Sequence, residues 1–341
     1  MRKYFRPIPS LDPARPPEAV SLAGGWAWFD RVECLSRGAL PQILPARAVP
    51  EGVLRALTAP RPAVAGLSMD RPRLMGILNV TPDSFSDGGA HLGLAAALAR
   101  ARAMAGDVDV IDIGGESTRP GAADVSEDEE IARTAPVIAA IREAGIALPV
   151  SIDTRKASVA MAALAAGADI VNDVSGLRHD PDLAPLTGAA GVPLCLMHSV
   201  ATPATMQADP RYDDVLLDVY DFLEAQIAVA EAAGIARGRI IVDPGIGFGK
   251  TTAHNLALLS RLSLFHALGC PILLGASRKR FIGAIGGAEP PRDRMPGSAA
   301  VALAAMAQGA QILRIHDTAE TAQALRLFQA STTGKGPEEA V

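Results

Sequence analysis

The sequence predicts an α/β fold, a (β/α)8 TIM barrel preceded by an N-terminal extension. From residue 74 onward, short runs rich in Leu, Ile and Val alternate with Ala- and Leu-rich stretches. Apolar runs that alternate with helices indicate parallel strands buried on both faces of a sheet. Eight successive units of this kind fit a closed barrel. The expected strands are residues 74–79, 108–113, 148–153, 168–173, 193–198, 239–243, 271–276 and 311–316.

The main alternative is an open, doubly wound sheet. Such a sheet is expected to carry a Gly-rich nucleotide-binding turn after its first strand. Here the first expected strand runs into the sequence NVTPD, so the closed barrel is favoured. The alanine-rich segments 130–145 and 156–167 are expected to be two of the helices between strands.

The first 72 residues differ from the rest, because they are rich in Pro and Arg. We interpret them as an extension that packs on the barrel, not as a catalytic unit. Two strand-like pieces, 26–29 and 32–35, are close enough to pair as a β-hairpin, and 61–72 is expected to be a linker. The predicted division is extension 1–72, barrel 73–331 and flexible C-terminal tail 332–341.

The composition argues against several classes of partner. The 341 residues are 49% hydrophobic and carry a net charge of −5, so neither nucleic acid nor an anionic membrane is expected. The N-terminus lacks the apolar segment of a secretory signal, and no run approaches the roughly 20 apolar residues of a membrane helix. Because Cys34, Cys195 and Cys270 show no paired or metal-type spacing, a reduced, cytoplasmic protein is expected.

One segment suggests a homodimer. Residues 297–310, GSAAVALAAMAQGA, are apolar nearly all round, so a single contact with the barrel would not bury every face of such a helix. We predict that this segment lines a dimer interface. The alternative is that the N-terminal extension covers it.

Polar residues stand at seven of the eight expected strand ends. In a (β/α)8 barrel the C-terminal ends of all strands open onto one mouth, and charges at buried strand tips are costly unless paired or used. A functional site at this mouth is therefore predicted. Its candidate residues are Asn79, Asp112, Asp153, Asn172, Asp243, Lys279, Arg314 and His316.

These residues divide by charge. A carboxylate can accept two parallel hydrogen bonds from a ring amide N–H and its neighbouring amino group, and Asn can donate to a ring nitrogen. The residues suited to such a neutral heterocycle are Asp153, Asn172 and Asp243. Basic residues of the last two strands lie where this fold commonly binds phosphate. They are Lys279, Arg314 and His316.

Each residue also has a purely structural alternative. Asp153 could cap the following helix, and Lys279 could be a solvated loop charge. His316 could be capped or partly exposed at a helix start, and Arg119 could pair with a helix carboxylate. It is the joint placement at one mouth that favours a site.

Two Gly- and Pro-rich loops, 80–93 and 114–127, are long for connections in a barrel. Long loops on a rigid scaffold commonly bind ligands or close over them. A closing loop also excludes water from a reactive intermediate.

Seven motifs, in order, resemble those of the dihydropteroate synthase family. The resemblance covers nearly everything from residue 74 to residue 330. It implies a transferase of folate biosynthesis, a sulfonamide target that uses Mg2+ to join (7,8-dihydropterin-6-yl)methyl diphosphate to 4-aminobenzoate. The motifs are GILNVTPDSFSDGG (76–89), IDIGGESTRPGA (111–122), SIDTRK (151–156), VNDVSG (171–176), DPGIGFGK (243–250), GASRKRFIG (275–283) and LRIHD (313–317).

The resemblance also implies individual roles. Asn79 would hold Mg2+ against the diphosphate, which Arg314 and His316 would bind, with Arg314 also stacking on the pterin. Met197 would pack on the pterin face. The residues that bind the pterin edge would be Asp112, Asp153, Asn172 and Asp243.

On the aminobenzoate side, Lys279 would contact both substrates and Phe248 would lie near the aminobenzoate. Two mobile loops would complete this pocket. The first would supply Thr81, Pro82 and Phe85, and the second Ser117, Thr118 and Arg119.

The implied reaction is a displacement at the exocyclic methylene of the pterin. The dihydropterin ring can spread positive charge as the C–O bond breaks, so a dissociative path is favoured, with Asp112 or Asp153 stabilising that charge. The expected catalytic residues are Lys279, Arg314, His316, Asp112 and Asp153. Two rivals are a pterin-binding methyltransferase, which would not need the basic residues, and a catalytically silent barrel, which the intact TPDSF and STRPG loops disfavour.

The chain departs from the family at two places. Ile246 stands where an aromatic residue is common, and Ser199-Val200-Ala201 replaces the usual Met-Gln-Gly. The first departure lies two residues from Phe248 and therefore bears on the aminobenzoate side.

Overall fold

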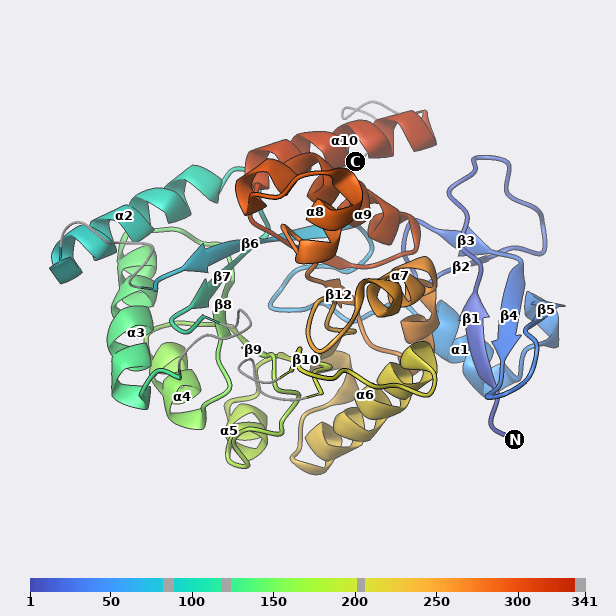
Figure 1. The fold of residues 1–341 in the computed structure, drawn as a ribbon, viewed down its shortest axis with the longest axis horizontal. Helices are drawn as coiled ribbons and strands as arrows, with labels where there is room; N and C mark the ends of the chain where they lie inside the picture. The colour runs from blue at the N-terminus through green and yellow to red at the C-terminus, as the bar shows by residue number, and fades with distance from the viewer. Residues whose placement is uncertain (82–88, 118–123, 201–205, 335–341) are drawn as a thin grey trace.

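The computed structural model describes residues 1–81, 89–117, 124–200 and 206–334, and its centre is a barrel of eight parallel strands (Figure 1). The hydrogen-bonded order is β11-β10-β9-β8-β7-β6-β13-β12, and a parallel bridge between Val242 and Ile272 joins the two remaining edges. The predicted barrel is therefore confirmed. Its strands are β6 (Arg73–Asn79), β7 (Val110–Gly114), β8 (Val150–Asp153), β9 (Ile170–Asp173), β10 (Leu194–Met197), β11 (Ile240–Asp243), β12 (Leu273–Leu274) and β13 (Ile312–Ile315).

Helices follow the strands and surround the barrel, as expected for crossover connections between parallel strands (Figure 1). The two alanine-rich segments form α3 and α4. The described connections include the short 3-10 helices η3 (Arg237–Arg239), η4 (Leu262–Leu268) and η5 (Pro291–Arg294). The α-helices are α2 (Gly89–Met104), α3 (Glu127–Glu143), α4 (Ala157–Ala165), α5 (Leu183–Ala190), α6 (Val215–Ala232), α7 (Thr252–Ser260), α8 (Arg280–Gly286), α9 (Met295–Ala307) and α10 (Thr318–Thr333).

Local side chains start several of these helices. Ser126 caps α3 by accepting a hydrogen bond from the backbone N–H of Glu129, and four acidic residues in the first turn complement the helix dipole. Asp214 caps α6 by accepting from the N–H groups of Leu216 and Leu217. A capping side chain from the local sequence therefore stabilises the first turn of α3 and of α6.

The N-terminal extension forms two small sheets and a helix. One sheet has the order β1-β4-β5 and the other pairs β2 with β3. Tyr4 donates a hydrogen bond to Asp221 on α6 at 2.9 Å, and Trp26 donates to the backbone oxygen of Met306 on α9 at 3.0 Å. The extension therefore packs on the barrel helices. Its elements are β1 (Tyr4–Pro7), β2 (Val20–Ser21), β3 (Trp28–Phe29), β4 (Arg31–Leu35), β5 (Gln42–Pro45), η1 (Ala46–Ala48) and α1 (Glu51–Thr58).

The predicted hairpin between 26–29 and 32–35 is wrong. β3 pairs with β2, whereas β4 pairs with β1 and β5. Only Asp30 separates β3 from β4, and a two-stranded hairpin needs a turn of at least two residues. The chain therefore passes from one sheet to the other without reversing.

Residues 61–72 are also not a loose linker. Arg61 is buried and donates to the backbone oxygen of His266 at 2.9 Å. Val64 and Met69 pack with residues near the starts of the barrel strands, such as Met75 and Val110. This segment therefore closes the end of the barrel opposite the predicted site, while the exact domain boundaries stay a prediction.

Two further expectations concern the chain as a whole. Cys34, Cys195 and Cys270 are buried free thiols. Within the described ranges, no helix combines the length and hydropathy required for a membrane span.

Candidate active site

Arg314 connects the ends of several strands at the mouth of the barrel. From β13, its Nε lies 2.6 Å from Oδ2 of Asp112 on β7, and its Nη2 lies 2.7 Å from Oδ2 of Asp153 on β8. Asn172 on β9 approaches Asp112 with an Nδ2–Oδ1 distance of 3.4 Å. Four residues that are far apart in the sequence therefore form one polar cluster.

This cluster contains two carboxylates and one guanidinium. Asp112, Asp153 and Asn172 are buried, and Arg314 is half-buried. Burial raises the pKa of Asp153 to about 7, with Arg314 opposing the rise and Asp112 adding to it. Burial alone would lower the pKa of Arg314, but Asp112 and Asp153 raise it above its ordinary value. The arginine therefore stays charged while the site favours a proton on Asp153 below about pH 7.

Asp243 ends β11 on the other side of Arg314. Its Oδ1 accepts a hydrogen bond from the backbone N–H of Gly245 at 2.7 Å, and burial raises the pKa of its carboxyl to about 6. A Cβ at Gly275 would lie 3.6 Å from Oδ2 of Asp243 and 3.8 Å from Cβ of Arg314. The bare glycine therefore lies between the two side chains.

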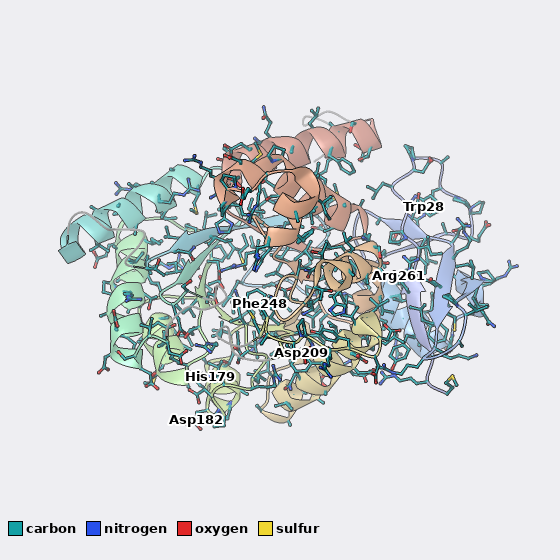
Figure 2. All side chains as sticks on the ribbon, in the orientation of Figure 1. Trp28, His179, Asp182, Asp209, Phe248 and Arg261 are labelled. Atoms are coloured by element: carbon teal, nitrogen blue, oxygen red, sulfur yellow. The ribbon has the colours of Figure 1, made fainter. Side chains whose placement is uncertain are left out.

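An apolar wall adjoins the polar cluster. Met197 and Phe248 pack with Val174 and Met206 in a small buried group, and Nζ of Lys279 lies 4.0 Å from the centre of the Phe248 ring. Figure 2 shows Phe248 in the middle of the barrel, well away from Trp28 of the extension. The lysine thus makes a cation–π contact with the wall and is not simply a solvated loop charge.

Ile246, which stands where the family commonly has an aromatic residue, is not part of this apolar wall. Ile246 is fully buried in the main core, whereas Phe248 packs in the separate group with Met197. We therefore expect its effect on aminobenzoate affinity to be indirect. Val200, from the second departure, lies against Gly249, where a Cβ would come within 2.2 Å of its Cγ2.

A pocket of about 290 Å3 lies between β6, α2 and the residues that follow β12 and β13. Asn79 and His316 line it, together with Arg100 and Arg278. Arg278 pairs with Asp317, and Arg100 donates to the backbone oxygen of His316 at 2.9 Å. The pocket therefore joins an amide, an imidazole and two guanidinium groups.

His316 is fixed at this pocket by Ser277. Its Nδ1 lies 3.0 Å from Oγ of Ser277, and its backbone N–H donates to the same oxygen at 3.2 Å. Burial, with the charge of Arg314 acting in the same direction, lowers the pKa of His316 to about 3. The imidazole is therefore neutral near pH 7 in the absence of a bound anion.

The structure also shows whether Asp153 caps α4, the helix that follows it. Lys156 is the N-cap of α4 and makes no side-chain capping bond, and the N–H of Ala157 donates to Asp180 instead. Asp153 therefore does not cap α4. Its described ion pair is with Arg314.

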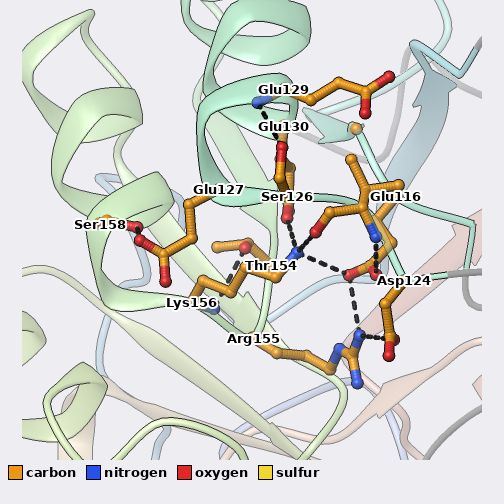
Figure 3. A network of polar contacts seen from close by, with 12 residues as sticks. Glu116, Asp124, Ser126, Glu127, Glu129, Glu130, Thr154, Arg155, Lys156 and Ser158 are labelled. Atoms are coloured by element: carbon orange, nitrogen blue, oxygen red, sulfur yellow. Dashed lines mark hydrogen bonds and ion pairs between the residues drawn. The ribbon is translucent and has the colours of Figure 1, made fainter.

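A buried network supports the base of the second long loop (Figure 3). One oxygen of Glu116 lies 2.9 Å from Nη2 of Arg155 and 3.3 Å from Nζ of Lys156, and Lys156 also pairs with Glu130 at 2.6 Å. The other oxygen of Glu116 accepts from the backbone N–H of Val125 at 3.1 Å. A hydrogen bond thus connects Glu116, which precedes the segment 118–123, with Val125, which follows it.

The predicted loop residues divide into two groups. Thr81 and Ser117 are described and half-buried. The remaining four lie outside the described residues: Pro82, Phe85, Thr118 and Arg119.

Sequence reasoning missed several residues of this region. Lys250 is buried beside Phe248, Glu116 holds the loop base, and Arg100 and Arg278 line the pocket. Lys250, Glu116 and Arg278 stand inside motifs that were recognised, so their presence there was the available signal. Arg100 lies on α2 outside any motif and had none.

The comparisons with known proteins agree with this picture. The family model described as pterin binding enzyme matches residues 75–316. The dihydropteroate synthase of Escherichia coli (strain K12) is 45% identical over 270 residues, covering 79% of this chain and 95% of that protein.

Solved structures agree as well. A dihydropteroate synthase of Xanthomonas albilineans with 4-aminobenzoic acid is 48% identical, with a TM-score of 0.75 and coverage of 80% of this chain and 98% of that one. A second structure from the same organism, in complex with 7,8-dihydropteroate, is 46% identical, with a TM-score of 0.72 and the same coverage. The barrel and the matched residues define the class as that of the pterin-binding enzymes. Within that class, the chain belongs to the dihydropteroate synthase family.

Proposed function

We propose that the protein condenses (7,8-dihydropterin-6-yl)methyl diphosphate with 4-aminobenzoate, giving 7,8-dihydropteroate and diphosphate. The observation that carries this proposal is the cluster of Arg314, Asp112, Asp153 and Asn172 in a chain so similar to the synthase of E. coli. The two Xanthomonas albilineans structures hold 4-aminobenzoic acid and 7,8-dihydropteroate, a substrate and the product of this reaction.

The acidic and amide groups suit the pterin edge. Asp153 and Asp243 are buried carboxylates, which can accept the ring N–H and the exocyclic amino group. Asn172 can donate to a ring nitrogen, and the planar guanidinium of Arg314 can stack on the ring while its charge faces the leaving group. Met197 would supply an apolar contact to the ring face.

The basic side would stabilise the leaving group. As the C–O bond of the methylene breaks, negative charge grows on the diphosphate, and Arg314 and His316 would bind it at the mouth of the barrel. The aminobenzoate nitrogen, held near Lys279 and Phe248, then attacks the methylene carbon and gives up one proton. Asp112 and Asp153 would stabilise the positive charge spread over the ring.

The residues present fit a magnesium ion that is shared with the substrate. Within the described part of the chain, no group of three His, Cys, Asp or Glu residues could hold a metal alone. Mg2+ commonly takes few protein oxygens and completes its shell with phosphates and water. Asn79 would provide such an oxygen, and the ion would neutralise charge on the leaving diphosphate.

A diphosphate-release assay tests the reaction. Release is expected only when the pterin diphosphate and 4-aminobenzoate are both present, and removal of Mg2+ with EDTA is expected to lower the rate by at least about tenfold. Restoring excess Mg2+ should recover it. Diphosphate release that ignores 4-aminobenzoate would reject the synthase activity, and full activity in EDTA would reject the metal.

We also propose that the protein is a cytoplasmic homodimer. On α9, Ala300 and Ala304 are exposed and Val301 and Leu303 are half-buried, although Trp26 of the extension covers the C-terminal end of the helix. Sedimentation at micromolar concentration should give a dimer, and Ala304→Glu should shift it to monomer. A wild-type monomer under these conditions would refute the dimer.

A further inference from the structure

Lys250 is a buried amine next to the apolar wall of the site. It lies near the end of the β11–α7 connection, residues 244–251, and the residue is only 4% exposed. Within the described residues, it forms no ion pair with a carboxylate. Its Nζ instead lies 3.0 Å from the backbone oxygen of Phe248 and 2.9 Å from Nδ1 of His198.

The connection that carries Phe248 is pressed against the end of β10. Gly245, Gly247 and Gly249 all have positive φ, at 69°, 81° and 59°. A Cβ on Gly245 would lie 1.9 Å from the backbone oxygen of His198, which no side chain could occupy. The connection and His198 therefore touch backbone to backbone, without room for adjustment.

Side chains hold three successive carbonyl groups of this connection. Gln207 donates to the oxygen of Gly247 at 2.7 Å, Lys250 to that of Phe248 at 3.0 Å and Tyr212 to that of Gly249 at 2.8 Å. Gln207 and Tyr212 approach from the stretch before α6. Lys250 is also within hydrogen-bond distance of His198, whereas Tyr212 meets the His198 ring only through an aromatic contact, with centroids 5.9 Å apart. Lys250 therefore links the Phe248 backbone to the residue that directly follows β10.

The contact between Lys250 and His198 depends on the charge of Lys250, and burial lowers the pKa of Lys250 to about 7. When Lys250 is an ammonium it can only donate, so Nδ1 of His198 then accepts and the ring proton sits on Nε2. Burial, with the charge of Lys250 acting in the same direction, lowers the pKa of His198 well below its ordinary value, in agreement with a neutral ring. The ring packs edge-on against Phe222, with centroids 4.7 Å apart.

We propose that Lys250 is a positioning residue for the aminobenzoate pocket, fixing the Phe248 ring against Met197 and Lys279 by joining Phe248 and His198. This inference rests on the proposed function, because Phe248 is assigned to the aminobenzoate through it. Met197 directly precedes His198 in the chain, so the same tie fixes both apolar walls. A hydrogen-bonding side chain of this length meets both partners, and an apolar one of equal length meets neither.

The test compares Lys250→Met with Lys250→Gln. Both side chains are one atom shorter than Lys, but Met has no donor and Gln keeps an amide donor. The Met variant should raise the KM for 4-aminobenzoate about tenfold, as loss of buried hydrogen bonds commonly does. The KM for the pterin diphosphate and kcat at saturation should change less than twofold. The Gln variant should recover part of the loss, and Lys3→Met, at an exposed site in the extension, should match wild type.

Amide hydrogen exchange supplies a readout that does not depend on turnover. Lys250→Met should speed exchange in residues 244–251, while α6 and β13 keep wild-type protection. Unchanged KM and exchange would overturn the proposal, and so would a parallel loss of kcat and of protection over the whole barrel. If wild type does not turn over the two substrates, the proposed function fails, and exchange still tests the role of Lys250 in holding the connection.

Discussion

Replacing Arg314 with Met is expected to lower kcat/KM for dihydropteroate formation by about 10³-fold, the size of effect seen when a preorganised charge donor is removed. Arg314 is the cation that contacts both Asp112 and Asp153, and under the proposed mechanism it also faces the departing diphosphate. Its loss removes positive charge from the leaving-group side and leaves two buried carboxylates without their ion pair. The change in kcat/KM is measured by following diphosphate release, either by stopped flow or in the steady state.

Stability must be separated from catalysis in this variant. Removing one partner of a buried ion pair commonly costs about 3–5 kcal/mol, so Arg314→Met should also unfold at lower urea concentration. Arg314→Lys keeps the charge but cannot bridge both carboxylates with a planar fork. It should fold more stably than the Met variant and still turn over at least about tenfold more slowly than wild type. Near-normal turnover in either variant would reject the role of Arg314.

The barrel could be predicted because its strands are continuous apolar runs. Six of the eight expected runs contain the observed strand, and β6 and β7 each extend one residue beyond their runs, to Arg73 and Gly114. Most observed strands are shorter than expected at one or both ends, as β12 is with only Leu273–Leu274. Those ends depend on hydrogen bonds to neighbouring strands, which the local sequence does not determine. The gathering of Asp112, Asp153 and Asn172 then followed from the fold, since all parallel strands end at the same mouth.

The partners of the individual side chains inside the site could not be predicted from the fold. Alternate residues of a strand share a face, and a strand that continued through residue 316 would place Arg314 and His316 on the same side. β13 ends at Ile315, so His316 lies beyond the strand and turns to Ser277, whereas Arg314 turns to the carboxylates. The ordered conformations of these side chains depend on neighbours that come from other strands.

The errors in the extension have a similar origin. The segments 26–29 and 32–35 were paired because they are close in sequence, but their partners are Val20–Ser21, Tyr4–Pro7 and Gln42–Pro45.

Lys250 was overlooked because its environment also depends on contacts between parts of the chain that are distant in sequence. Its burial depends on the contact of its connection with β10, which lies about fifty residues earlier in the chain.

Asp153→Asn is expected to stabilise the fold relative to wild type as the pH rises. The pKa of Asp153 is about 7 in the fold, against 3.8 for an ordinary Asp. A group whose pKa is raised on folding stabilises the native state fully below its unfolded pKa, and this contribution is lost as the pH rises through the folded pKa. Asn carries no proton to lose, so the difference in unfolding free energy, variant minus wild type, should grow from pH 4 to pH 7 by up to about 4 kcal/mol.

Urea unfolding at unit steps from pH 4 to pH 8 measures this difference. Asp243→Asn is the matched comparison, because burial raises the pKa of Asp243 only to about 6, so its gain should be smaller and should level off about one pH unit earlier. A difference for Asp153→Asn that stays flat, or that falls with rising pH, would mean that Arg314 holds the Asp153 carboxylate ionised throughout. In that case the cluster would carry a net negative charge before any pterin binds, and the ring N–H groups would meet two ionised acceptors at neutral pH. The expected rise instead means that Asp153 takes up a proton beside the charged Arg314 near neutral pH, and binding of the pterin would shift this equilibrium toward the carboxylate.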